Sequence, residues 1–291
     1  MDSINKRSYG QKLKAYKRSP LSLILFLLVM VSTILTIGIL LFLIGYIMIK
    51  GIPNIKPELF QWEYNTLNMS LMPALINTVI MTLISLLIAA PIGIFSAIYL
   101  VEYAKRGNRL IGIIRITAET LSGIPSIVYG LFGLLFFVTA LRWGMSLLAG
   151  AFTLSIMILP LIIRTSEEAL KAVPDSYREG SFGLGAGKLR TVFRIVLPSA
   201  MPGILAGVIL GIGRIVGESA ALIYTAGTVA EIPKGRDFLF DSTRTLSVHM
   251  YALTSEGLYV NQSYATAVIL LFIVVLINWF SGYIAKKLTK S

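Results

Sequence analysis

The chain has 291 residues, of which 56% are hydrophobic and 14% are charged, and its mean hydropathy is +0.79. Soluble domains contain about 25% charged residues, so this composition excludes an ordinary soluble protein. The absence of cysteine excludes disulfides and thiol chemistry. The formal net charge is +12. Basic residues collect in the cytoplasmic loops of membrane proteins, so we expect membrane lipid, and no nucleic acid, beside these charges.

The chain begins with a basic tail, residues 1–20, which is followed by about 29 apolar residues. The apolar region of a secretory signal peptide has only about 7–15 residues. We therefore expect residues 21–49 to be retained as a first transmembrane helix.

Long apolar segments continue along the chain, and each reaches the roughly 20 residues that cross a bilayer as a helix. The segments without acidic or basic residues are Pro20–Ile49, Tyr64–Val101, Thr120–Leu141, Trp143–Ile163 and Gly257–Ala285. The pattern predicts an all-α polytopic membrane protein with six transmembrane helices. They cover about 21–49, 73–101 with a kink or break near Pro91, 110–140, 146–168, 201–226 and 262–285.

The basic residues predict the orientation of these helices. Nineteen of the 26 lysines and arginines lie in the N-terminal tail, in residues 105–115, in residues 164–194 and in the C-terminal tail. With six helices all four groups fall on one side, which is the cytoplasmic side because positive charge is retained there. Both termini are therefore expected in the cytoplasm. A cytoplasmic loop then covers about 169–200 and an outer loop about 227–261.

The cytoplasmic loop has the pattern of two short amphipathic helices joined by a glycine-rich turn, Gly183-Leu184-Gly185-Ala186-Gly187. Such an element can dock onto a partner protein, or it can lie on the surface of anionic lipid. Composition and periodicity leave both interpretations open.

The loop also carries a motif. Glu179-Gly180-Ser181, three residues, Gly185, nine residues and then Ile195-Val196-Leu197-Pro198 resemble the Glu-Ala-Ala, Gly, Ile-x-Leu-Pro signature of ABC importer permeases. Gly180 and Ser181 depart from the two alanines of that signature but are also small. The resemblance implies a coupling helix that fits a cleft of an ATP-binding subunit. The implied coupling residues are Glu179, Gly180, Ser181, Gly185, Ala186, Ile195, Leu197 and Pro198.

A closer resemblance covers about residues 70–285. The segments LSGIPSIVYGLFGL (121–134), GRIVGESAALIYTAG (213–227) and LSVHMYAL (246–253) are similar to phosphate-specific transport permeases of the PstA type. This resemblance implies an ABC transporter type-1 permease (MetI-like) core in the cytoplasmic membrane of a bacterium or archaeon. It also implies three kinds of partner: a homologous PstC-type permease, two PstB-type ATP-binding subunits and an extracytoplasmic PstS-type phosphate-binding protein.

Motifs for catalysis or cofactor binding are not found in the sequence. The chain lacks a phosphate-binding Gly-x-x-x-x-Gly-Lys-Ser/Thr loop, so ATP hydrolysis is expected in a separate subunit. We expect no metal or cofactor and interpret the single histidine, His249, as a surface or packing residue. Two alternatives stay open: an ABC permease for another solute such as sulfate or molybdate, and a self-sufficient channel or secondary transporter.

Arg214 and Glu218 are the unusual residues, because they lie within an apolar stretch. A charge at mid-membrane costs about 2.5–3.5 kcal/mol. At a spacing of four residues on a helix the two side chains can pair, either as a structural link or as part of an anion pathway. A guanidinium binds phosphate oxygens in a fork. Because phosphate still carries a proton near neutral pH, a nearby carboxylate favours it over sulfate.

Three further residues complete the predicted substrate pathway. Ser219 follows Glu218, while Pro125 and Ser126 lie where proline interrupts the expected span 110–140. A second charged pair, Arg115 and Glu119, has the same spacing and is expected to be structural.

Overall fold

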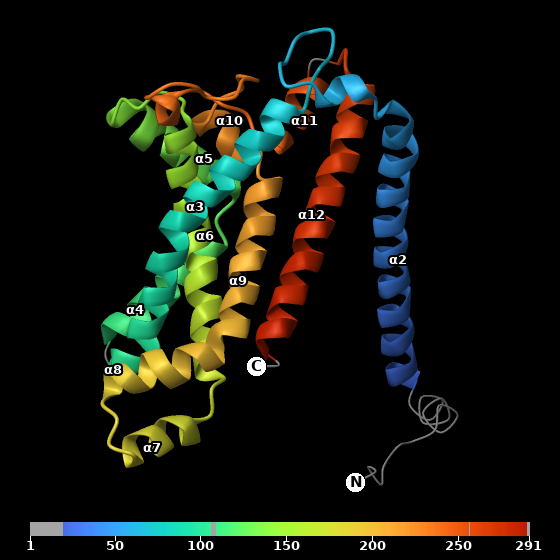
Figure 1. The fold of residues 1–291 in the computed structure, drawn as a ribbon. Helices are drawn as coiled ribbons and strands as arrows, with labels where there is room; N and C mark the ends of the chain where they lie inside the picture. Colours follow the sequence, from blue (N-terminus) through green and yellow to red (C-terminus); the bar gives the residue numbers. More distant parts are fainter. Residues whose placement is uncertain (1–19, 106–108, 256, 290–291) are drawn as a thin grey trace. The chain divides into compact units, whose positions relative to one another are not determined.

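The computed structural model describes residues 20–105, 109–255 and 257–289, and every regular element in this part of the chain is a helix (Figure 1). The basic tail predicted for residues 1–20 lies, except for Pro20, outside the described residues. The chain divides into two compact units, residues 1–50 and 51–291. The two units are described separately below.

The first unit contains helix α2, Pro20–Gly51. It carries no acidic or basic residue before Lys50, and its 32 residues correspond to roughly 48 Å of helix, enough to cross a bilayer. The hydroxyls of Thr33 and Thr36 donate to carbonyl oxygens four residues earlier, at 2.7 and 2.8 Å. These two hydroxyl groups are therefore satisfied within the helix.

The second unit contains the remaining helices. In chain order they are η1 Ile52–Asn54, η2 Pro57–Phe60, α3 Met72–Ile98 with η3 Tyr99–Tyr103, α4 Arg109–Ser122, α5 Ser126–Gly133 with η4 Leu134–Ala140, α6 Leu147–Lys171, α7 Asp175–Gly183, α8 Lys188–Thr191 with η5 Val192–Val196 and α9 Leu197–Gly217, α10 Ala220–Thr225, η6 Phe238–Phe240, α11 Leu246–Ser255 and α12 Val260–Thr289. Figure 1 shows α7 and α8 at one end of this unit and α11 at the other.

Five helices in the described residues are long and apolar enough to cross a membrane, and a sixth is obtained if one bent pair forms a single span. The bent pair occupies the span expected at 110–140. The pair is bent by 101° between Ser122 and Ser126. Of the kink or break expected near Pro91, the break is wrong, because α3 continues through this proline.

The second departure concerns the span expected at 201–226. Helix α9 ends at Gly217, and the separate short helix α10 starts at Ala220. At its other end α9 continues α8 and η5, so one helical segment extends from Lys188 to Gly217. The expectation of a single helix through Glu218 is therefore wrong.

Helix α6 is the most buried of these candidate spans and forms the centre of the second unit. Its fully buried Leu154, Met157, Ile158 and Ile162 belong to the largest apolar cluster, which also includes residues of α3 and α9. Small residues let the neighbouring helices approach closely: a Cβ on Gly93 of α3 would lie 2.7 Å from Ile162 Cγ2.

Hydroxyl groups add polar links between the same helices. Ser155 of α6 donates to the carbonyl of Ser85 in α3 at 3.1 Å, and Ser85 donates to the carbonyl of Ala151 at 3.2 Å. These contacts fix α3 against α6. The interrupted helices pack against this pair.

Candidate functional site

The short helices α5 and α10 lie side by side in parallel. A Cβ on Gly130 of α5 would be 2.7 Å from the Cα of Ala221, and a Cβ on Gly133 would be 2.6 Å from Thr225 Cγ2. Since both residue numbers increase together along the contact, the two helices start at the same end. The interruption before α5 and the interruption before α10 therefore belong to one region of the second unit.

The structure places all five predicted pathway residues at these interruptions. Pro125 and Ser126 start α5, whereas Glu218 and Ser219 lie immediately before α10. Arg214 lies in the last turn of α9, one turn before the chain leaves the helix. Pro125 is exposed and the other four are partly exposed.

The predicted pairing of Arg214 with Glu218 is wrong. Glu218 has extended backbone angles, φ −76° and ψ 126°, because α9 ends one residue earlier. One carboxylate oxygen of Glu218 accepts the N–H of Ala221 at 3.1 Å, which caps the start of α10. The carbonyl of Glu218 accepts the hydroxyl of Ser247, from α11, at 2.5 Å. Glu218 thus stabilises the non-helical backbone between α9 and α10 and connects it to α11.

Arg214 has no carboxylate within ion-pair distance among the described residues. Its charge is close enough to the phenol of Tyr129, on α5, to interact with it electrostatically. Tyr129 in turn donates to the carbonyl of Leu121 at 2.7 Å, across the bend between α4 and α5. The guanidinium is therefore a half-buried cation without a counter-ion, next to the break between α4 and α5.

The predicted pair of Arg115 and Glu119 is also wrong. Arg115 Nη2 lies 2.7 Å from Glu167 Oε1, and Lys171 Nζ lies 2.6 Å from the same oxygen. The carboxylate of Glu167 is 90% buried, so this pair links α4 to α6. The role is structural, as expected, but the partner is on another helix.

The cytoplasmic loop folds as a helix, a glycine turn and a helix, as its sequence pattern predicted. Gly185 has φ +78°, a conformation that favours glycine. The buried hydroxyls of Ser181 and Thr191 lie 2.8 Å apart and join α7 to α8.

Four of the eight predicted coupling residues line one groove of about 460 Å³. The full lining is Ser181, Leu184, Gly185, Ala186, Arg190, Arg194 and Ile195. Glu179 and Gly180 are exposed on α7, and Leu197 and Pro198 start α9. The motif therefore covers both the α7–α8 element and the start of α9, the helix that carries Arg214 in its last turn.

Arg178, which was not predicted as a functional residue, holds this loop in place. Its guanidinium binds Glu102 of η3 at 2.7 Å, Asp175 at 3.2 Å, and the carbonyls of Leu170 and Val173. The available signal was Glu102, the only acidic residue at the end of a long apolar run. The loop is held to α3 and α6 by this side chain.

His249 is a packing residue, which agrees with its interpretation from the sequence. It is fully buried in α11 with its ring at an edge-on 6.0 Å from Tyr64. Burial, and then the positive charge of Arg244, lower its pKa to about 3. Among the described residues, no group of three or more histidine, cysteine, aspartate or glutamate side chains is arranged to hold a metal ion.

Comparison with known proteins is consistent with this geometry. The model of the family described as binding-protein-dependent transport system inner membrane component matches residues 89–290. Over 271 residues the chain is 32% identical to the probable ABC transporter permease protein YqgI of Bacillus subtilis (strain 168), covering 87% of this chain and 92% of YqgI.

A second relative is the phosphate transport system permease protein PstA 1 of Mycobacterium tuberculosis (strain CDC 1551 / Oshkosh). The chain is 40% identical to it over 154 residues, which cover 53% of this chain and only half of that protein. Among solved structures, an inward-facing crystal form of the MetNI methionine ABC transporter matches with a TM-score of 0.58 at 20% identity, over 75% of this chain and 94% of that chain. This match confirms the all-α, MetI-like fold.

The contact between α5 and α10 generates a first prediction. Gly130→Ala should lower the thermal unfolding midpoint of the purified chain, because its methyl group would meet the backbone of Ala221, and overpacking typically costs about 1–3 kcal/mol. Gly282→Ala is the matched control, since its Cβ would meet nothing within 4 Å. Equal midpoints for the two variants would contradict the close approach.

The cap on α10 generates a second prediction. Glu218→Ala removes the acceptor for the Ala221 N–H and should reduce stability by about 1 kcal/mol, the usual value of a helix cap. Glu218→Gln keeps an oxygen acceptor and should remain close to the parent. Thermal unfolding in detergent measures both, and an Ala variant as stable as the Gln variant would argue against the cap.

Proposed function

The chain belongs to the family of binding-protein-dependent transport system inner membrane components, and we propose that it is the permease subunit of an ABC importer that carries inorganic phosphate into the cell. The name of the relative PstA 1, a phosphate transport system permease protein, supports the choice of solute. The observation that carries the proposal is Arg214, a half-buried cation beside the interrupted helices that has no carboxylate partner in the part of the chain that the structure describes.

Arg214 would provide the anion site. A guanidinium stays charged even when it is partly desolvated, and its planar donors match two phosphate oxygens at once. In a transmembrane segment an irregular backbone is tolerated where it lines a polar cavity or is buried in protein. Pro125, Ser126 and Ser219 are at such irregular positions, so we assign them to the same pathway.

Glu218 would help to select phosphate over sulfate or molybdate. One of its oxygens caps α10, but a carboxylate can accept about four hydrogen bonds, so acceptor capacity remains. Phosphate near neutral pH still carries an O–H group and can donate a hydrogen bond to such an acceptor. Fully deprotonated anions cannot, and they are repelled by the carboxylate.

The exposed apolar residues of the cytoplasmic loop support docking to an ATP-binding subunit. Tyr177, Phe182 and Leu184 have relative exposures of 51%, 48% and 91%. A membrane-embedded channel that gates itself has no use for such a surface in water, so this observation favours an ABC permease over a channel.

The complete transporter would contain this chain, a PstC-type permease, two PstB-type ATP-binding subunits and a PstS-type phosphate-binding protein. ATP would be hydrolysed in the PstB-type subunits, and this chain would be non-catalytic. The distribution of basic residues supports a cytoplasmic position for both termini and for the α7–α8 element. Rigid-body movement of the two permease halves would expose the anion site to each side in turn.

Arg214 provides the direct test of the transport proposal. In cells that express the whole transporter, Arg214→Gln should abolish uptake of labelled phosphate while the complex still assembles. Arg214→Lys should restore it only in part, because lysine keeps the charge but loses the planar fork. Arg236→Gln removes an exposed arginine elsewhere and serves as the control.

Two further results complete this test. Labelled sulfate should not be taken up by the parent transporter, and Glu218→Gln should raise sulfate uptake relative to phosphate. Normal phosphate uptake by an assembled Arg214→Gln complex would rule out the anion site.

The coupling role generates a separate prediction. Glu179→Arg reverses an exposed charge on α7 and should reduce co-purification of the ATP-binding subunits without preventing membrane insertion. Glu58→Arg makes the same reversal at an exposed position in η2 and should leave the complex intact. A full complement of ATP-binding subunits on the Glu179→Arg chain would remove α7 from the interface.

A further inference from the structure

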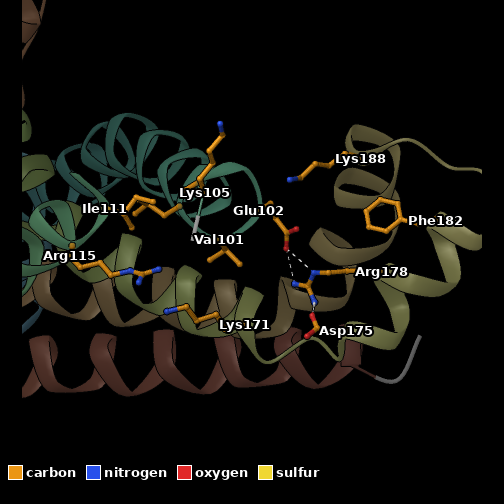
Figure 2. Close-up of a pocket in the computed structure, with 13 residues that line it drawn as sticks. Val101, Glu102, Lys105, Ile111, Arg115, Lys171, Asp175, Arg178, Phe182 and Lys188 are labelled. Atoms are coloured by element: carbon orange, nitrogen blue, oxygen red, sulfur yellow. Dashed lines mark hydrogen bonds and ion pairs between the residues drawn. The ribbon is translucent and has the colours of Figure 1, made fainter. Parts of the chain in front are cut away.

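A large basic pocket lies where α3, α4, α6, α7 and α8 meet (Figure 2). Its volume is about 870 Å³. Five basic and two acidic side chains line it, namely Lys105, Arg115, Lys171, Arg178, Lys188, Glu102 and Asp175. The lining includes none of the five predicted pathway residues, Pro125, Ser126, Arg214, Glu218 and Ser219.

Ion pairs inside the protein neutralise only part of this charge. Glu102 and Asp175, the two acidic residues of the lining, both bind Arg178. Arg115 and Lys171 share the single carboxylate of Glu167. Figure 2 shows Arg115 and Lys171 close together on one side of the pocket, and Arg178 on Glu102 and Asp175 on another.

Lys105 and Lys188 have no carboxylate partner among the described residues. Lys188 is instead held over the ring of Tyr103, with its Nζ 5.1 Å from the ring centroid. Five cations thus face three carboxylates, and the excess positive charge is at the side where Lys105 and Lys188 lie. Such an excess attracts an anion with more than one charge or with several oxygens.

The rest of the wall is apolar and includes Leu100, Val101, Ile111 and Phe182. The pocket is also far larger than one phosphate ion requires. Basic pockets between the ends of transmembrane helices on the cytoplasmic side are sites for anionic lipid headgroups. An amphiphile uses both parts of the wall, whereas a free ion uses only the cations.

We propose that this pocket binds the headgroup of an anionic phospholipid, with its phosphate between the Lys105–Lys188 side and the Arg115–Lys171 side and its glycerol against the apolar wall. Because residues of α7 and α8 line the pocket, the bound lipid stabilises the α7–α8 element against the ends of α3 and α6. The proposal does not depend on which solute is transported.

The test measures the thermal unfolding midpoint of the full chain in neutral detergent while phosphatidylglycerol is added. The midpoint should rise with phosphatidylglycerol and not with phosphatidylcholine. In Lys105→Gln/Lys188→Gln the lipid concentration for half of the effect should increase about thirtyfold, since each basic residue near a lipid surface contributes about 1 kcal/mol. Lys105→Arg/Lys188→Arg keeps both charges and should retain the effect.

The matched control is Arg109→Gln/Arg164→Gln, which removes two exposed arginines that do not line the pocket. It should respond to phosphatidylglycerol as the parent does. An equal loss in this control, or an equal response to phosphatidylcholine, would overturn the proposal. Stabilisation by inorganic phosphate without any by phosphatidylglycerol would assign the pocket to a free anion and would also overturn it.

Discussion

The contact between α5 and α10 is the constraint on which the candidate site depends. Each helix starts after an interruption, and interrupted backbone within a membrane must be buried in protein or face a polar space. Gly130 allows α5 to touch the backbone of Ala221, so the two interruptions are brought into one region. The Glu218 carboxylate then accepts the Ala221 N–H at the start of α10, and Ser247 donates to the Glu218 carbonyl just after the end of α9. As a consequence of this arrangement, Arg214 has no carboxylate counter-ion within residues 20–105, 109–255 and 257–289.

Much of the architecture could be predicted because it follows from long apolar runs and local signals. The all-α class, the interruption at Pro125 and the helix–glycine–helix loop are each determined by a few neighbouring residues. The end of α9 is different, since Glu218 leaves the helix to cap α10 while its carbonyl accepts a hydroxyl from α11, 29 residues further along the chain. Spacing of four residues is evidence for pairing only where the helix continues.

The second charged pair teaches the same lesson from tertiary structure. Arg115 has Glu119 one turn away, yet it binds Glu167 on α6, a carboxylate that is 90% buried and that Lys171 shares. Its partner is chosen by the packing of α4 on α6, which no local pattern contains. Arg178 is similar, because its partner Glu102 lies 76 residues away in sequence. Residues that hold the cytoplasmic loop therefore had to be found in the structure.

In the proposed transporter, the continuous helical segment from Lys188 to Gly217 would transmit movement of the α7–α8 element to Arg214. From Lys188 to Arg214 it measures roughly 39 Å at 1.5 Å per residue, and its foot is joined to α7 through Ser181 and Thr191. A tilt of about 5° at that foot displaces Arg214 by roughly 3 Å over this length. That displacement equals the length of one hydrogen bond. In the proposed transporter, a small rotation of the α7–α8 element would therefore be enough to make or break a hydrogen bond between the Arg214 guanidinium and a bound anion.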